Sequence, residues 1–224
     1  MLREVEMIKS GKKLKDYIAE DIRFKLVING KSFTFRISPT LKEEFVIGYC
    51  FGEGLIENLE DFKEIKIEKD VAKVKINIKK RKLFKINSDL VVSYKEIIES
   101  MERLKNESEA WRKTGGVHIS AIVSGEEFIL VEDINRHACI DKLLGIALKR
   151  SLKFSNSYVV CSGRLSEGRV KKIIMAGVPI IASMAAPLFS GIECAKKYGL
   201  TLAGFVRNGK INIYSCPERI RNEV

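Results

Sequence analysis

Residues 132–142 read Glu-Asp-Ile-Asn-Arg-His-Ala-Cys-Ile-Asp-Lys and join a predicted strand to a predicted helix. The apolar run Phe128 to Val131 before them is typical of a strand, and the run Leu143 to Leu148 after them is typical of a helix. A strand-to-helix junction opens at the end of a sheet, where α/β proteins bind ligands. This junction holds three carboxylates, two cations and His137, one of only two histidines in 224 residues. It therefore predicts an α/β sheet with a site at its edge.

The same alternation of strands and helices continues through the C-terminal half. It predicts strands at 117–123, 128–131, 158–161 and 179–183, helices at 136–150 and 187–198, and a closing hairpin of 200–206 with 211–214 that turns at Asn208-Gly209. Strands that alternate with helices form a sheet covered by helices on its faces. We therefore expect an α/β fold with a sandwiched, partly parallel mixed sheet.

The first 80 residues predict a β-rich region with one helix, although residues 1–20 show no clear pattern. Asn29-Gly30 predicts a tight hairpin turn, and a second hairpin is expected around Lys69-Asp70. Thr40 and Glu43 have the spacing of a capping box, which predicts a helix start. We predict a β-rich subdomain at 1–85, a variable loop and connecting helix at 86–113, capped by Ser93 and Glu96, and an α/β domain at 114–224.

The formal net charge of +11 indicates an anionic partner such as nucleic acid, a phosphorylated cofactor or an acidic protein. A Lys-rich surface without such a partner explains the charge equally well, since many Lys residues alternate with Glu. The basic run Lys79 to Lys82 is suited to a phosphate backbone, but such runs more often form a solvated strand end or linker.

The five cysteines are widely spaced and contain no Cys-x-x-Cys pair, which predicts free thiols in a reducing compartment. No stretch reaches the roughly 18 apolar residues that a membrane span needs. The first 15 residues carry charges throughout and lack the apolar core of a signal peptide. We therefore expect a cytoplasmic protein with no membrane partner. The cysteines are Cys50, Cys139, Cys161, Cys194 and Cys216.

Three polar junctions follow predicted strands: Asp133 to Arg136, Ser162 to Arg164, and Ser183 to Pro187. The carboxyl ends of neighbouring strands converge on one crevice, so these junctions predict one binding site. Within it, Gly163 permits close approach of the backbone to a ligand and Arg164 suits a phosphate. The hairpin tip Phe205 to Lys210 adds an aromatic ring and two cations, although composition alone favours an ordinary exposed turn.

His118 and His137 are candidate metal ligands, acid–base groups or hydrogen-bonded structural residues. Zinc deaminases hold their metal through H-x-E followed by P-C-x-x-C. Neither histidine stands in an H-x-E motif and no P-C-x-x-C occurs in the chain, so zinc deaminase chemistry is disfavoured. We expect no metal site and instead a histidine beside a carboxylate that orients a loop or ligand.

Several motifs occur together in the order of a known family. They are Thr114-Gly-Gly-Val-His118, Glu132-Asp133 with Arg136-His137 and Asp141-Lys142, Ser162-Gly163-Arg164 with Ser166, Ala176-Gly177-Val178-Pro179, Ala186-Pro187, Gly199 to Phe205 with Arg207, and Tyr214 with Pro217-Glu218-Arg219. In the N-terminal half, Val27 to Gly30, Ser38-Pro39-Thr40 and Gly48 to Gly54 also fit. The chain resembles the FdhD/NarQ family, the formate dehydrogenase accessory sulfurtransferases.

This resemblance implies a cytidine-deaminase-like α/β domain without the zinc site, in a cytoplasmic homodimer. It implies binding of the bis-molybdopterin guanine dinucleotide form of the molybdenum (or tungsten) cofactor, for which GDP is a surrogate. Family members take sulfur from a cysteine desulfurase and pass it to this cofactor before its insertion into formate dehydrogenase. By resemblance, the cofactor-binding residues are Phe205, Val206, Arg207, Asn208, Gly209, Lys210, Gly115, Gly116, His118, Asp133, Arg136, His137, Ser162, Gly163 and Arg164.

The family carries its persulfide cysteine in a Cys-Gly-x-Cys-Gly loop, and this chain departs from it. Asp89 and Val92 stand at the two cysteine positions, with Leu90 and Ser93 at the glycines. A persulfide needs a thiolate, so we assign no catalytic residue.

Three hypotheses follow from this departure. The first is an accessory protein that binds the cofactor with sulfur transfer lost or rerouted. The second is a sulfurtransferase that uses another thiol, with Cys139 as the first candidate. The third, the least favoured, is a nucleic-acid-binding module that works through Lys79 to Lys82.

Overall fold

A six-stranded mixed sheet forms the centre of the protein, as seen in the computed structural model, which describes residues 1–222. The strand order is β13-β12-β11-β10-β8-β9, with β10, β11 and β12 parallel to one another and β8 and β13 antiparallel to their neighbours. The predicted sandwiched mixed sheet is therefore confirmed. Its strands are β8 (His118–Ser124), β9 (Glu127–Asp133), β10 (Tyr158–Cys161), β11 (Ile180–Ser183), β12 (Thr201–Arg207) and β13 (Lys210–Ser215).

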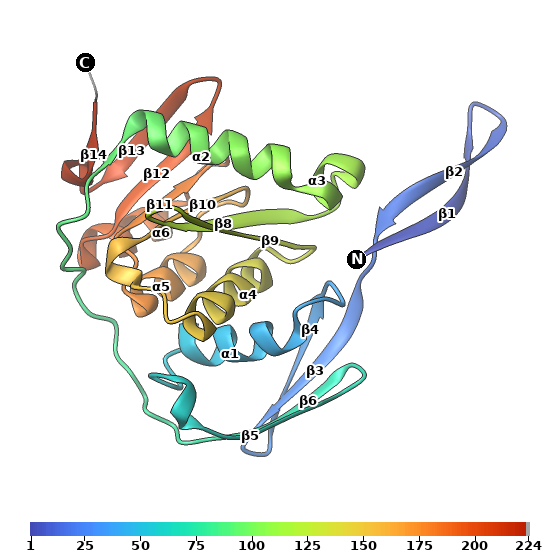
Figure 1. Ribbon diagram of the computed structural model, residues 1–224, viewed down its shortest axis with the longest axis horizontal. Coiled ribbons are helices and arrows are strands. Elements are labelled where there is room, and N and C mark those ends of the chain that lie inside the picture. The colour runs from blue at the N-terminus through green and yellow to red at the C-terminus, as the bar shows by residue number, and fades with distance from the viewer. Residues whose placement is uncertain (223–224) are drawn as a thin grey trace.

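Helices cover both faces of this sheet (Figure 1). Alternate residues of a strand point to opposite faces, so Tyr158 and Val160 enter one core while Val159 and Cys161 enter the other. The predicted segment 86–113 supplies the helices of the first face. They are α2 (Tyr94–Glu107) and α3 (Glu109–Thr114), and the other face carries α4 (Arg136–Lys149), α5 (Glu167–Ala176) and α6 (Phe189–Tyr198).

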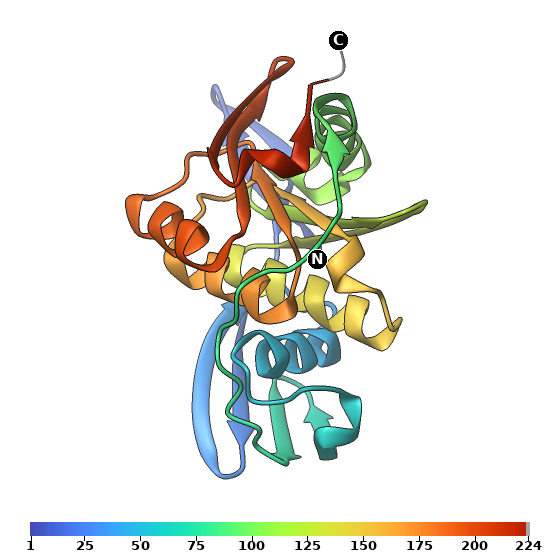
Figure 2. The same ribbon diagram turned by 90° about the vertical axis from the view of Figure 1, so that its left-hand side faces the viewer.

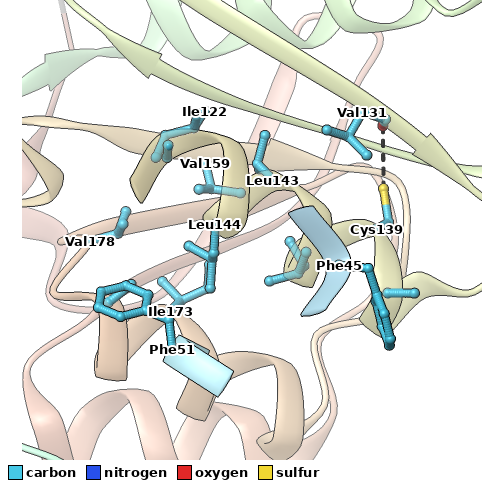
Figure 3. Packing of buried hydrophobic residues seen from close by; sticks show 14 of the residues in the cluster. Phe45, Phe51, Ile122, Val131, Cys139, Leu143, Leu144, Val159, Ile173 and Val178 are labelled. Carbon is cyan, nitrogen blue, oxygen red and sulfur yellow. Dashed lines mark hydrogen bonds between the residues drawn. The ribbon is translucent and has the colours of Figure 1, made fainter. Parts of the chain in front are cut away.

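A smaller sheet of order β4-β3-β6-β5 lies beyond α4, with α1 between the two (Figure 1). Asn29 and Gly30 both have positive φ, which confirms the predicted tight turn between β3 and β4. Phe45 and Phe51 of α1 pack in the core together with Leu144 of α4 (Figure 3). The elements of this region are β3 (Ile22–Ile28), β4 (Lys31–Ile37), α1 (Lys42–Gly52), β5 (Phe62–Glu68) and β6 (Val71–Ile76).

Three local predictions need correction or addition. Residues 1–20 form a hairpin of β1 (Leu2–Lys9) and β2 (Lys12–Ala19), which projects from the body (Figure 1). Both faces of β2 are largely exposed. Because neither face is buried, its sequence does not alternate between apolar and polar residues. Thr40 does not cap α1, because Leu41 is the N-cap in a left-handed conformation without a side-chain bond. The last helix begins at Phe189 and not at Pro187. The predicted Ser93–Glu96 capping box is confirmed at the start of α2.

An extended strap, residues 77–91, connects the small sheet to the α/β region and faces the viewer in Figure 2. It ends in β7 (Val92–Ser93), which pairs with β14 (Ile220–Arg221). Short 3-10 turns lie at Leu59–Asp61, Phe154–Asn156 and Pro217–Arg219. Within residues 1–222, no helix is long and apolar enough to cross a membrane.

Candidate functional site

The three polar junctions meet at one end of the main sheet. His118 at the start of β8 pairs with Asp133 at the end of β9, and the adjacent strands β10 and β11 end level with each other at Cys161 and Ser183. The Ser183 hydroxyl donates hydrogen bonds to the carbonyl oxygens of Gly163 at 2.9 Å and Cys161 at 3.1 Å. Polar side chains far apart in sequence therefore share one edge, as the sequence predicts.

A cluster of two histidines and two arginines surrounds Gly163, and we call it the His–Arg cluster: His118, Arg136, His137 and Arg169. A Cβ atom built on Gly163 would lie 2.6 Å from Arg169 Nη1, 3.1 Å from Arg136 Cβ and 3.3 Å from His118 Nδ1. Only glycine fits between these side chains. A Cβ on Gly168 would lie 3.6 Å from His137 Nε2, which places the start of α5 against the second histidine.

Burial and the neighbouring guanidinium groups keep both histidines neutral. Desolvation lowers the pKa of His118, and the charges of Arg169 and Arg136 lower it further. The same causes, in the same order, lower the pKa of His137 to about 4, with a smaller contribution from Lys172. Both histidine residues are partly exposed. The cluster therefore carries positive charge and is in part accessible to solvent.

Ser162 links His118 to the strand beside it. Its hydroxyl lies 3.3 Å from His118 Nδ1 and accepts a hydrogen bond from the backbone N–H of Ile119 at 3.0 Å. Gly163 is buried, whereas Arg164 is exposed at the same loop. Ser162, Gly163 and Arg164 therefore belong to the site, and Arg164 is the cation of this loop that faces solvent.

Arg169 was not anticipated from the sequence. Its neighbours Glu167 and Lys171 are polar, so the segment reads as a solvated helix face. Arg169 nevertheless stands four residues before Ile173, on the buried stripe of α5, and is 0% exposed. A charged residue on the apolar stripe of an otherwise amphipathic helix is the signal that identifies it.

Asp133 and Asp141 of the 132–142 segment form buried ion pairs within the protein. Asp133 is 0% exposed and forms an ion pair with the equally buried Lys142 at 2.5 Å, and it also accepts from the backbone N–H groups of Ser38 and Asn135. It therefore positions the start of α4, which carries Arg136 and His137, and has no oxygen exposed to a ligand.

Asp141 belongs to a second buried network with Lys172 and Glu53. Lys172 Nζ lies 2.6 Å from the Asp141 carboxylate and 2.9 Å from that of Glu53. Burial is the main cause that raises the pKa of Asp141 to about 6. This network joins α1, α4 and α5 beneath the His–Arg cluster.

The Phe205–Lys210 hairpin continues the same edge. The backbone N–H of Phe205 donates to the carbonyl oxygen of Ala185, so loop 183–187 bridges the hairpin and the Gly163 loop. The Arg207 guanidinium lies 5.5 Å from the centre of the Phe205 ring. A hollow of about 410 Å³ is lined by Phe205, Arg207, Asn208, Lys210 and Asn212.

The remaining predicted site residues differ in their accessibility. Val206 is 1% exposed and packs into the core, whereas Asn208 and Gly209 form the exposed turn with positive φ. Gly115 ends α3 in a left-handed conformation, and the Cβ position of Gly116 faces Ala19 of β2 at 3.4 Å. The two glycines therefore lie where the N-terminal hairpin meets the start of β8.

The two residues predicted to stand at the family's cysteine positions lie at the opposite end of the sheet. Val92 is 2% exposed within β7, and Asp89 lies on the strap (Figure 2). The strap is fixed by a 2.8 Å hydrogen bond from the N–H of Ile86 to the carbonyl oxygen of Tyr198, just before β12 begins. Neither position provides a thiol, and neither lies on the binding edge.

Cys139 is close to the His–Arg cluster but is an inert core thiol. It is 0% exposed and donates to the carbonyl oxygen of Val131 at 3.3 Å (Figure 3). Burial is the chief cause that raises the pKa of its thiol to about 12. The structure therefore gives no support to Cys139 as a sulfur carrier.

The basic run 79–82 is partly engaged in intramolecular contacts. Lys79 pairs with Asp61 at 3.1 Å, and Arg81 donates to the carbonyl oxygen of Met175 at 2.8 Å. A larger hollow of about 770 Å³ lies on the small sheet, lined by β3, β5 and β6, and contains none of the predicted site residues. Among residues 1–222, no group of three or more His, Cys, Asp or Glu side chains is arranged to hold a metal ion.

The fold and this edge define a mixed α/β protein with a candidate site that gathers guanidinium, imidazole and aromatic groups. The chain belongs to the FdhD/NarQ family, whose model matches residues 19–88 and 79–221. The two matched stretches overlap at 79–88, within the strap.

Individual relatives support the same assignment. The sulfur carrier protein FdhD of Methanothermobacter thermautotrophicus is 35% identical and covers 98% of this chain and 99% of its own. That of Staphylococcus haemolyticus is 33% identical over 87% of this chain and 86% of its own. The crystal structure of a candidate formate dehydrogenase accessory protein from Desulfotalea psychrophila superposes with a TM-score of 0.86 at 28% identity, covering 99% of both chains.

Proposed function

We propose that this protein assists formate dehydrogenase maturation by binding the bis-molybdopterin guanine dinucleotide cofactor as cargo, without carrying sulfur on a thiol of its own. The observation that carries the proposal is the continuous edge formed by the Gly163 loop, loop 183–187 and the Phe205–Lys210 hairpin. Arg136, Arg164, Arg207 and Lys210 give this edge the positive charge that pyrophosphate requires.

The missing loop supports the second part of the proposal. The alignment with the Methanothermobacter relative spans 245 positions, more than the 224 residues of this chain, so it contains gaps in this chain. The strap, in which we place the family's cysteine positions, is held by backbone hydrogen bonds to Gly54, Leu55 and Tyr198 and provides no cysteine. The proposed binding residues are therefore retained in a chain that lacks the proposed sulfur-carrying cysteines.

Within this proposal the hairpin holds the guanine nucleotide end, and the Gly163 loop holds phosphate. Formate dehydrogenase is the partner that receives the cargo, and the protein works in the cytoplasm as a homodimer. The projecting β1–β2 hairpin, which exposes Ile8 at 72% and Tyr17 at 47%, supports an interface between copies. A cysteine desulfurase is a partner only of relatives that retain the cysteine loop.

Titration with GDP tests the nucleotide half of the proposal. Arg207→Ala removes a charge-assisted contact, which is worth about 1.5–3 kcal/mol, so GDP affinity should fall at least about tenfold in calorimetry. Lys210→Ala should weaken binding less. Lys31→Ala is a matched control, because Asn29-Gly30-Lys31 repeats the Asn208-Gly209-Lys210 turn on the small sheet.

The control should bind GDP as the wild type does, since Lys31 lies at a different sheet. Failure of the wild-type chain to bind GDP would contradict the proposal. Equal affinity of wild type and Arg207→Ala would also contradict it.

A further inference from the structure

Arg169 is the largest fully buried side chain of residues 1–222, and only one of its three guanidinium nitrogens has a hydrogen-bond partner. Nη1 donates to the carbonyl oxygens of Gly163 at 2.6 Å and Arg164 at 3.3 Å. Nε and Nη2 have no hydrogen-bond partner. Within residues 1–222, the other buried side-chain polar atoms without a partner are Arg136 Nε and Ser166 Oγ, so all four belong to residues around the Gly163 loop.

The other buried cations of residues 1–222 are paired with carboxylates, so an unpaired buried guanidinium is unusual in this protein. Lys142 pairs with Asp133, Lys172 pairs with Asp141 and Glu53, and Arg219 pairs with Glu218. Arg169 has no carboxylate within salt-bridge distance among residues 1–222. A buried charge is normally paired, and each unsatisfied buried donor costs about 1–3 kcal/mol.

The residues that touch the Gly163 loop beside Arg169 are positive or neutral, and the carboxylate that acts on His137, Glu53, is already paired with Lys172. Arg136 and Arg169 both depress the pKa values of His118 and His137. The absent side chain of Gly163 allows the guanidinium to approach the loop backbone, and both histidine residues are partly exposed. An anion at this point would accept hydrogen bonds from the open donors, and each neutral imidazole has one N–H group that can donate to it as well.

We propose that the His–Arg cluster is a binding site for a tetrahedral oxyanion, with Arg169 as its principal charge partner. The ligand is either a phosphate group of a nucleotide or a free oxyanion, which share this chemistry. The inference rests on the proposed function only for the identity of the molecule that carries the oxyanion. It does not depend on the Phe205–Lys210 hairpin.

The two histidines make the test direct, because the chain contains no others. Ring signals of the ¹⁵N-labelled full chain are followed by NMR, with His118→Gln to assign them. Adding inorganic phosphate up to about 20 mM, against chloride of equal ionic strength, should shift both rings saturably. The pKa of His137 should rise from about 4, because the anion offsets the two guanidinium charges.

Arg169→Gln keeps a polar side chain but removes the charge, so phosphate affinity should fall at least about tenfold. Arg219→Gln is the matched control, because Arg219 is also buried and donates to a glycine carbonyl, that of Gly199, at the other end of the sheet. It should leave the phosphate response unchanged. Arg136→Gln, at a partly exposed position, tests the site again if Arg169→Gln does not fold.

Separate ligands distinguish the sources of the oxyanion. Phosphate and GDP should both shift the histidine signals, guanosine should not, and Arg207→Ala should abolish neither shift. Loss of GDP binding with retained phosphate binding would contradict the proposed function and leave the oxyanion site intact. No saturable response to phosphate in the wild type, an equal response in Arg169→Gln, or a response to guanosine would each overturn the inference.

Discussion

Cys139 lies near the His–Arg cluster, but its burial makes the thiol unreactive. It lies one helical turn after Arg136 on α4, yet its thiol donates into the core and its pKa is raised to about 12. Cys50 has a pKa raised to a similar value, also chiefly by burial. At neutral pH neither residue forms the thiolate that attacks a persulfide donor.

We therefore predict that no cysteine of the native chain carries sulfur. After incubation with a cysteine desulfurase and cysteine, intact-mass spectra should show no adduct of roughly 32 Da, the mass of one sulfur atom. A thiol reagent should label Cys216 first, since it is the one cysteine that is partly exposed, and Cys139 only after unfolding. A sulfur adduct on Cys139, lost in Cys139→Ala, would contradict this prediction and restore the sulfurtransferase hypothesis.

At the scale of elements, two glycines set the distance between α1 and α4. A Cβ on Gly48 would lie 1.7 Å from the carbonyl oxygen of Asp141, and one on Gly145 would lie 1.9 Å from that of Glu44. The two helix backbones are thus in direct contact. This close crossing brings Glu53, the C-cap residue of α1, to Lys172 and completes the network with Asp141.

Gly48→Ala should destabilise the protein by about 3 kcal/mol or more, because the helices must separate to admit one methyl group. Gly168→Ala is the control on α5, where the nearest atom to the new Cβ is 3.6 Å away and stability should stay equal or rise by up to about 1 kcal/mol. Urea unfolding measures both. Equal stability of the two variants would show that α1 and α4 do not hold this separation.

At the scale of the whole molecule, a buried ion pair joins the N-terminal region to the α/β region. Lys142 Nζ donates to the carbonyl oxygen of Ser38 at 3.0 Å and pairs with Asp133, which accepts from the Ser38 N–H. Residues about a hundred positions apart thus share one buried contact. The start of α4, which carries Arg136 and His137, is fixed by this contact as well.

Lys142→Met should cost about 3–5 kcal/mol of unfolding free energy, because it leaves the Asp133 carboxylate buried without a partner. Lys149→Met removes a partly exposed cation of the same helix that also bridges to α1, through Glu43 and Glu44, and should cost at most about 1 kcal/mol. Urea denaturation at neutral pH compares the two. Similar small losses would show that the buried pair does not stabilise the joint between the two regions.

Local chemistry explains which parts of the fold were predictable. The Asn29-Gly30 and Asn208-Gly209 turns and the Ser93–Glu96 capping box depend on neighbouring residues alone, and all three are found. The N-terminal hairpin was missed because its exposed strands lack a buried face. The convergence of the polar junctions also followed, since the ends of adjacent strands must share an edge.

By itself the sequence determined the mixed α/β sheet and the family, because hydrophobic period and motif order are properties of the linear chain. The tertiary structure decided which charges are neutralised. It assigned Asp133 and Asp141 to Lys142 and Lys172, and it left Arg169 among His118, His137 and Arg136 without a carboxylate. Charge pairing depends on side chains far apart in sequence that meet only after folding. For that reason the carboxylates of the junction have structural contacts, and the cations beside them form the candidate site.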